Sequence, residues 1–386
     1  VHTLDYVGYS RNGYIVFKLG SAPEGNAVVA AKDGASKILW SWHIWTTAAF
    51  DGNSIKVQTY ETKPRTVPAY YETVTKRTLK MMDRNLGAAS ATASKVAAEV
   101  IKTYGLLCQF GRKDPFPGPG VMTSTNNAEF IPSYDASGTL LVRRSNEIVN
   151  SSISTGTDAA AIALQLANTV EHPLMFIKPG ADKAAQYRGD GSNISYNWIW
   201  AAHRNTLPWQ VSNKLWGSDL IKTGEVKIFG TKTDIKKTIY DPCPYGYHMP
   251  PQDAWTNFVT VTDEYEASSS GGYNVHADDK ASVASSNFTN ASFPVFGRRF
   301  FTTGTAEATV DGESNVAFYP AVGGRLDDGA IGWVGQKLLY WSASPFDNTS
   351  ITSARMGGAF YGTTQWVVTS VDTARGYAFP VRCVRD

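Results

Sequence analysis

Three cysteines and six histidines are the residues of this 386-residue chain best suited to catalysis or metal binding. No CxxC pair occurs, so the cysteine spacing matches neither a zinc site nor a disulfide-dense scaffold. The histidines include no i, i+4 pair of the kind that binds a metal on one face of a helix. A GxSxG elbow, an HExxH helix and a P-loop are also absent. The sequence therefore predicts no catalytic residue, no metal ligand and no cofactor.

Two of the cysteines are candidates for a structural disulfide. Cys243 lies in a rigid turn between Pro242 and Pro244, and Cys383 lies in a strand-like run near the end of the sequence. A bond between them would close a loop of about 140 residues and stabilise the fold by about 4 kcal/mol in the chain-entropy model. Two buried thiols are the alternative that the sequence leaves open. Cys108, in an apolar run, is expected to be a small core residue.

Binding through surface contact is the other kind of function to consider, and two sets of residues are candidates for it. Trp209, Trp333 and Trp366 could stack on sugar rings if exposed, although tryptophans are more often buried. Arg188-Gly189-Asp190 lies in a segment expected to be a loop and could dock on a host receptor. Such a tripeptide also arises by chance in roughly one chain of this length in ten or fifteen, so coincidence is the alternative.

Acidic residues cluster at three places, Asp278-Asp279, Asp311-Gly312-Glu313 and Asp327-Asp328. None of these clusters has the ligand spacing of an EF-hand. Solvated loop charge is the favoured interpretation, and weak binding of a structural calcium ion is the alternative.

The composition excludes several classes of partner. A formal net charge of +2 gives no electrostatic footprint for nucleic acid or for an anionic membrane surface. No apolar stretch approaches the roughly 18 residues that a membrane-spanning helix needs. Low charge (18%), 11 Trp, 19 Tyr and 17 Phe, with many turn-forming residues, are typical of exported β-rich proteins. Because residue 1 is Val, we expect a mature or trimmed product whose export signal lies outside the sequence.

The hydrophobic pattern predicts an α+β fold with much irregular coil. Helical spacing of apolar residues, with capping or breaking residues, predicts helices within 92–104, 159–168 and 250–260. Short apolar runs predict strands at 14–17, 27–31 and 38–45 and several more over 316–384. Residues 113–160 and 261–292 have little periodicity and are expected to be long surface loops, where binding residues commonly lie.

Seven segments, taken together and in this order, resemble one known family. They are Met82–Ala88, Gly105–Phe116, Asn197-Trp198, Leu215–Gly217, Lys237–Pro250, Tyr340–Ser344 and Val381–Asp386. The family is the Fibrobacter succinogenes major paralogous domain, found at the C-terminal end of fimbrillin-like surface proteins of Bacteroides-type bacteria. The resemblance implies a C-type-lectin-like fold, related to formylglycine-generating enzymes, with antiparallel sheets and few helices.

The same resemblance implies a domain division and a function. Residues 1–26 would be lead-in strands or the end of a preceding β module, and 27–386 the family domain, with long insertions at about 113–235 and 261–292. The expected function is a non-enzymatic adhesin module, exported to the cell surface or fimbrium of a Gram-negative bacterium. It would bind a protein or glycan ligand on a host or neighbouring cell through its surface loops and would contact other pilus subunits.

Two alternatives stand beside the adhesin. An enzyme related to formylglycine-generating enzymes is the first, but Cys383 has no neighbouring cysteine to form the redox pair of that branch. A purely structural pilus subunit is the second. The Glu-Pro-Asn, Gln-Pro-Asp and Trp-Asn-Asp strings of calcium-dependent sugar-binding lectins are absent, so sugar binding through a metal is not expected.

Overall fold

The structure is a computed structural model, and the part that it describes has gaps. The described residues are 3–10, 12–21, 24–48, 50–51, 54–63, 76–122, 128–141, 147–156, 158–179, 197–199, 207–218, 235–260, 272–279, 296–345, 356–362 and 367–386. Arg188, Asp190 and Trp366 lie outside these residues. Within them the chain is α+β, with mostly antiparallel sheets and few helices.

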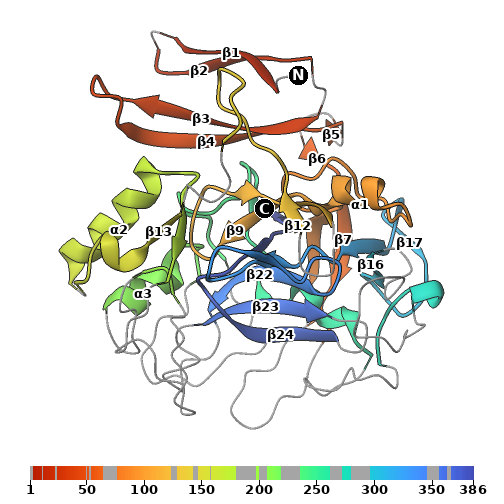
Figure 1. Cartoon of the computed structure of the whole chain (residues 1–386). Helices are drawn as coiled ribbons and strands as arrows, with labels where there is room; N and C mark the ends of the chain where they lie inside the picture. The colour runs from red at the N-terminus through yellow and green to blue at the C-terminus, as the bar shows by residue number, and fades with distance from the viewer. Residues whose placement is uncertain are drawn as a thin grey trace.

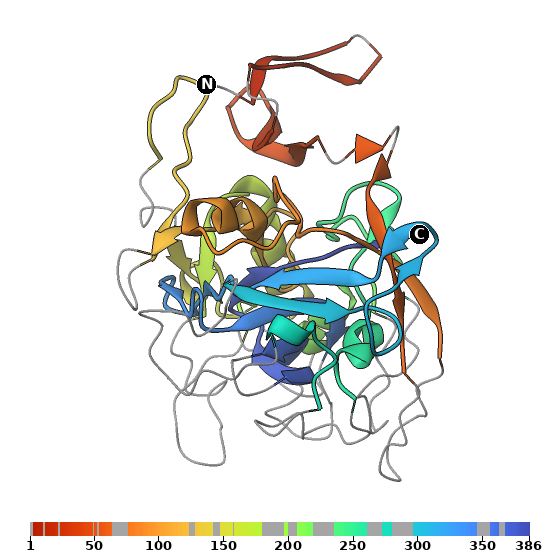
Figure 2. The same ribbon diagram turned by 90° about the vertical axis from the view of Figure 1, so that its right-hand side faces the viewer.

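Two antiparallel hairpins form an N-terminal layer, here residues 3–48. The first hairpin pairs β1 (Leu4–Tyr9) with β2 (Ile15–Leu19), and the second pairs β3 (Gly25–Lys32) with β4 (Ile38–Thr46). The turn of the second hairpin follows from Asp33, whose Oδ1 accepts hydrogen bonds from the backbone N–H groups of Ala35 and Lys37. Both views place this layer above the rest of the molecule, here called the body (Figures 1 and 2). The expected boundary between residues 26 and 27 falls within β3, which begins at Gly25.

The second hairpin is held to the body by buried polar contacts. Lys113 and Asp114 form an ion pair of 2.6 Å, and both side chains are buried. Ser41 of β4 donates a hydrogen bond to Asp114 and accepts one through its carbonyl from Lys113. The Lys113 ammonium also lies 4.6 Å from the ring centre of Trp40. Hydrogen bonding of this kind offsets the cost of burying two charges where the layers meet.

The body is built from sheets that the end of the chain completes. One sheet has the order β15-β26-β8-β7, and another has the order β10-β9-β25-β20-β21. Two C-terminal strands, β25 (Ala378–Pro380) and β26 (Val384–Arg385), are therefore interior strands, each between segments far away in sequence. Strand β26 pairs with β15 (Tyr247–His248) and β8 (Thr78–Met82), and β25 pairs with β9 (Leu106–Gln109) and β20 (Gly324–Arg325). The outer strands of the two sheets are β7 (Val57–Glu61), β10 (Phe116–Pro117) and β21 (Ile331–Gly332).

The remaining strands form smaller sheets around these two. A three-stranded antiparallel sheet, β22-β23-β24, lies below the C-terminal strands in Figure 1. Its strands are β22 (Leu338–Pro345), β23 (Met356–Gly362) and β24 (Val367–Ala374). The short pairs are β5 (Phe50–Asp51) with β6 (Ser54–Ile55), β11 (Pro119–Met122) with β12 (Ala128–Phe130), β16 (Gly297–Phe301) with β19 (Val316–Pro320), and β17 (Thr309–Val310) with β18 (Glu313–Ser314).

Two predicted helices are present; the predicted end of the first and the predicted start of the second are confirmed, and the second continues three residues beyond Asn168. Helix α1 (Ala97–Tyr104) ends at Gly105, whose φ of 70° is a conformation that favours glycine, and a Cβ there would lie 2.4 Å from the Leu86 carbonyl oxygen. Helix α2 (Ala159–Glu171) begins after Asp158, whose side chain accepts a hydrogen bond of 2.8 Å from the Ala161 N–H. The third prediction is a 3₁₀ helix, η2 (Gln252–Phe258). The described 3₁₀ segments also include η1 (Asn150–Ser152) and η3 (Ala277–Asp279).

The segment expected to be one long insertion, 113–235, contributes to the core. Its described part includes α2, helix α3 (Leu207–Lys214) and the parallel pair β13 (Glu147–Val149) and β14 (Phe176–Lys178). Phe116, Phe176 and Ile177 are fully buried. These three residues therefore belong to the body, whereas residues 131–141 are mostly exposed and have little regular structure, as expected for a surface loop. None of the helices in the described ranges combines the length and apolarity needed to cross a bilayer.

Candidate functional site

The two candidate disulfide cysteines are joined. Cys243 and Cys383 form a disulfide with their Cα atoms 5.9 Å apart and 140 residues between them in sequence. The turn that carries Cys243 is shaped by Asp241, whose carboxylate accepts hydrogen bonds from the backbone N–H groups of Cys243 (2.8 Å) and Met249 (2.9 Å). The bond fastens the C-terminal segment, just before β26, to the proline-rich turn.

The third cysteine is not placed for chemistry. Cys108 lies in β9 with no exposed surface, and its thiol is free. Burial, together with the nearby carboxylates of Asp241 and Asp114, raises the pKa of the Cys108 thiol. A thiol with a raised pKa stays protonated near neutral pH and is a weak nucleophile. This agrees with the expectation that Cys108 is a core residue.

A buried cation, Arg382, organises the polar centre of the body. Its guanidinium lies 3.8 Å from the ring centre of Tyr319 and donates hydrogen bonds to the Phe318 carbonyl (2.6 Å) and to Asn85 Oδ1 (3.1 Å). The hydroxyls of Tyr60 and Tyr319 are 3.1 Å apart, and burial raises the pKa of both tyrosines. These phenols therefore stay protonated near neutral pH, and the group acts as a structural network.

Trp333 is the one predicted sugar-stacking residue whose side chain the structure describes. It is half-buried and lies in the turn between β21 and β22 with a φ of 59°, which is uncommon for a bulky residue. Its carbonyl accepts hydrogen bonds from the backbone N–H groups of Gln336 (2.8 Å) and Lys337 (3.0 Å), so the turn holds this conformation. Strained backbone of this kind is often found at functional sites.

A chain of aromatic rings connects Trp333 to the core. Successive ring centres lie 6.5, 4.8, 5.8 and 5.9 Å apart. The rings, from inside to outside, are those of Trp216, Trp341, Phe379, Tyr377 and Trp333. Trp216 and Trp341 are fully buried, whereas Tyr377 and Trp333 are half-buried. The outer pair is therefore held in a fixed orientation by packing that extends into the core.

A lysine accompanies this outer aromatic pair. The Lys337 ammonium lies 4.0 Å from the ring centre of Trp333, which is a cation–π distance. Burial lowers the pKa of Lys337. We call Trp333, Tyr377 and Lys337 the aromatic platform. An indole ring, a phenol and an ammonium group are a combination that can stack on a sugar ring and donate hydrogen bonds to its hydroxyls.

The side chains of the other predicted binding residues are not described. Trp209 lies in α3, but the structure does not describe its side chain. Trp366, Arg188 and Asp190 stay predictions, because they lie outside the described residues. The strained backbone at Trp333 had no signal in the sequence. The only pattern that could have indicated the platform was the run of aromatic residues at Tyr377 and Phe379.

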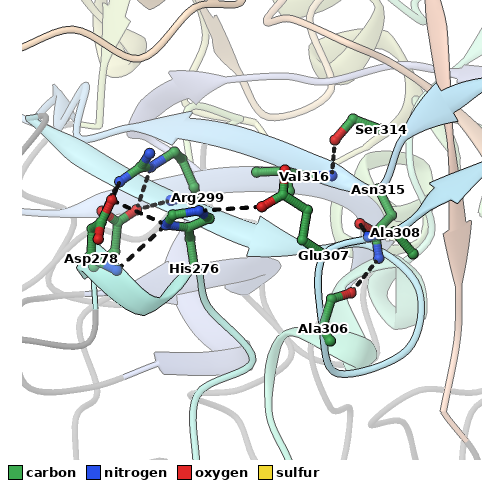
Figure 3. A network of polar contacts seen from close by, with 10 residues as sticks. His276, Asp278, Arg299, Ala306, Glu307, Ala308, Ser314, Asn315 and Val316 are labelled. Carbon is green, nitrogen blue, oxygen red and sulfur yellow. Dashed lines mark hydrogen bonds and ion pairs between the residues drawn. The ribbon is translucent and has the colours of Figure 1, made fainter.

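Two of the three acidic clusters, Asp278-Asp279 and Asp311-Gly312-Glu313, are engaged with basic side chains. Asp279 forms a two-pronged pair with Arg299, and His276 lies 3.5 Å from Asp278 and 3.4 Å from Glu307 (Figure 3). Lys80 forms an ion pair with Asp311, and Lys56 forms one of 3.0 Å with Glu313. No group of three or more candidate ligands that could hold a metal occurs among the described residues. The carboxylates of these two clusters therefore neutralise the protein's own cations.

The segments that carry the family resemblance meet in one core cluster. All except Asn197-Trp198 supply a member, among them Met82, Phe110, Trp216, Trp341 and Cys383. The remaining segment is attached to the same place, because the Trp198 indole donates a hydrogen bond of 2.5 Å to the Phe110 carbonyl. Dispersed segments thus form one buried unit around the disulfide. Comparisons with family models, with curated proteins and with solved structures gave no match.

Proposed function

We propose that this protein is a non-enzymatic adhesin module that binds a glycan or a protein ligand by surface contact. The observation that carries the proposal is the aromatic platform, a tryptophan in a strained turn at the outer end of an aromatic chain anchored in the core. A rigid aromatic surface loses little conformational entropy on binding, so it suits a weakly polar ligand such as a sugar ring. The Lys337 ammonium beside it would donate hydrogen bonds to hydroxyl or carboxylate groups of that ligand.

The proposal also includes the family and the cellular location. We infer a C-type-lectin-like domain of the Fibrobacter succinogenes major paralogous type, exported to the surface or fimbrium of a Gram-negative bacterium. Two observations support this inference. The resembling segments share one core cluster, and a disulfide closes that cluster, as expected for a protein of an oxidising compartment.

Burial of the Cys108 thiol and the Tyr319 phenol favours a binding function over a catalytic one. Cys108 and Tyr319 have no exposed surface, and burial raises the pKa of each. Each therefore lacks the access to substrate and the ionisation that a nucleophile needs. The enzyme alternative predicts turnover of a sulfatase-type cysteine peptide with copper or calcium added.

The test is a glycan array combined with a pull-down on host extracellular matrix, using the whole chain and two tryptophan variants. We expect Trp333→Ala to lose about five- to thirtyfold in affinity, because one ring that stacks on a ligand contributes about 1 to 2 kcal/mol. Trp42→Ala is the matched control, since Trp42 is 37% exposed on β4 and is not part of the platform. Blank arrays and pull-downs, equal binding by both variants, or turnover of the cysteine peptide would each contradict the proposal.

A further inference from the structure

The first hairpin, β1–β2, exposes a large apolar surface. Four of its aromatic side chains are exposed to 58%, 87%, 71% and 40%; they are Tyr6, Tyr9, Tyr14 and Phe17. Together they expose roughly 500 Å², taking about 200 Å² for a whole aromatic side chain. Val7, Val16 and Leu19 add to this area with exposures of 44%, 46% and 54%. Patches of a few hundred Å² on a soluble protein commonly mark an interaction surface.

One face of the hairpin is apolar at the paired positions that follow the register shift in β1. The strand register places Val7 opposite Phe17 and Tyr9 opposite Ile15, so these four side chains share a face. Leu19 belongs to the same face, two residues beyond Phe17. The opposite face carries Tyr6, Val16 and Lys18 and is mixed. A sheet with one wholly apolar face is stable when more strands or a second layer cover it, and two strands alone are marginal.

The two edges of the hairpin differ in how well they are protected. Strand β1 contains Asp5, Gly8 and a register shift between Leu4 and Tyr6, all features that discourage pairing with another strand. Strand β2 has no glycine, no proline and no register shift, and its sequence Ile-Val-Phe-Lys-Leu favours β structure. Among the described residues β2 pairs with β1 alone. Its outer edge is therefore an open template for another strand.

We propose that two copies of this chain associate through the outer edge of β2, in an antiparallel pair centred on Phe17. The pairing would produce a four-stranded sheet with the order β1-β2-β2-β1 about a twofold axis. Around this centre Phe17 lies opposite Phe17 of the second copy, Ile15 opposite Leu19, and Val16 opposite Lys18. Apolar side chains then meet on one face, and no like charges are opposed.

The positive charge of Lys18 favours pairing centred on Phe17 over pairing centred on Lys18. A pair centred on Lys18 would place two ammonium groups opposite each other, which is destabilising. Centring on Phe17 avoids this and also pairs all five residues of the strand. The contact is smaller than the roughly 800 Å² per partner of a standard interface, so we expect a dimer that depends on concentration in the micromolar range.

The first test is sedimentation of the full-length chain over a range of concentrations. We expect the weight-average mass to rise from monomer to dimer between about 1 and 100 μM. Phe17→Asp should abolish this rise, because it opposes two carboxylates at the twofold axis. Phe17→Lys should abolish it as well, whereas an equimolar mixture of the two variants should form a dimer again. Restoration by the mixture excludes local unfolding as the cause of the loss.

The second test is cross-linking at the twofold axis. Phe17→Cys should form an intermolecular disulfide under mild oxidation, and Tyr9→Cys on the far strand is the matched control. Background cross-linking through the native cysteines should be low, because Cys108 is buried and the other two form a disulfide. A monomer at 100 μM with equal cross-linking of the two variants would overturn the proposal, and so would capture of a different protein by monomeric chains. Neither outcome bears on ligand binding by the aromatic platform.

Discussion

The N-terminal layer and the body use the same residue types in opposite ways. In the body, rings such as those of Trp255, Phe258 and Tyr340 are fully buried and pack at centre distances of 4 to 6 Å. In the first hairpin of the layer, Tyr6, Tyr9 and Tyr14 are 58%, 87% and 71% exposed. The difference lies in the number of covering elements, because the body encloses its rings between sheets whereas the first hairpin has a single neighbour. Most of the stability should therefore reside in the body, whereas the layer offers a surface for self-association.

Removing the disulfide is the change with the largest expected effect on the body. The double variant Cys243→Ala/Cys383→Ala should lower the free energy of unfolding by about 4 kcal/mol, since it frees a 140-residue loop in the unfolded state. Urea denaturation followed by tryptophan fluorescence measures this. Cys108→Ala, which removes only a buried sulfur, serves as the control and should cost less. An equal loss in both variants would show that the cross-link does not stabilise the body.

Truncating the central arginine is expected to cost somewhat less. Arg382→Met should lower the stability of the body by about 3 kcal/mol, because it leaves the Phe318 carbonyl and Asn85 without their donor. Arg385→Met is the matched control, as Arg385 is exposed, lies three residues further along the chain and should change stability by less than about 0.5 kcal/mol. Equal urea midpoints for the two variants would contradict the structural role assigned to Arg382.

The smallest effect, and one confined to the layer, is expected from acid. Burial lowers the pKa of His43 to about 4, from an ordinary value of 6.5. The unfolded layer therefore binds a proton more readily than the folded layer between pH 6.5 and 4, so folding of β3–β4 loses stability as the pH falls through this window. Hydrogen exchange of the β3–β4 amides should accelerate relative to the body over that range. His43→Gln should remove this pH dependence, and an unchanged dependence in that variant would exclude His43 as its source.

Local signals explain which elements the sequence predicts well. The apolar spacing with Gly105 and the cap at Asp158 locate α1 and α2, since both signals act within a few residues. Three of the short strands predicted in the C-terminal third are also confirmed, namely β19, β22 and β25. Helix α3 was missed, although Pro208 in its first turn is a helix-start signal. The parallel pair β13–β14 was missed because its strands have three residues each, too few for a periodic pattern.

Long-range and conformational features had no comparable signal. The proximity of Cys243 and Cys383 depends on how the last strands enter two sheets, so the sequence left disulfide and free thiols open. The positive φ of Trp333 depends on the turn that encloses it. The exposure of β1–β2 also could not be predicted, because alternating apolar runs specify strands but not what covers them.

The interior position of β25 and β26 has a consequence for how the protein is made. A ribosome synthesises residues 378–385 last among the described strands, so both large sheets stay incomplete while most of the body has already emerged. Until then β8 and β9 each lack a neighbour and expose an edge that can pair incorrectly. Holding the nascent chain unfolded until the final strands are available, and only then oxidising the cysteines, would favour a correct product.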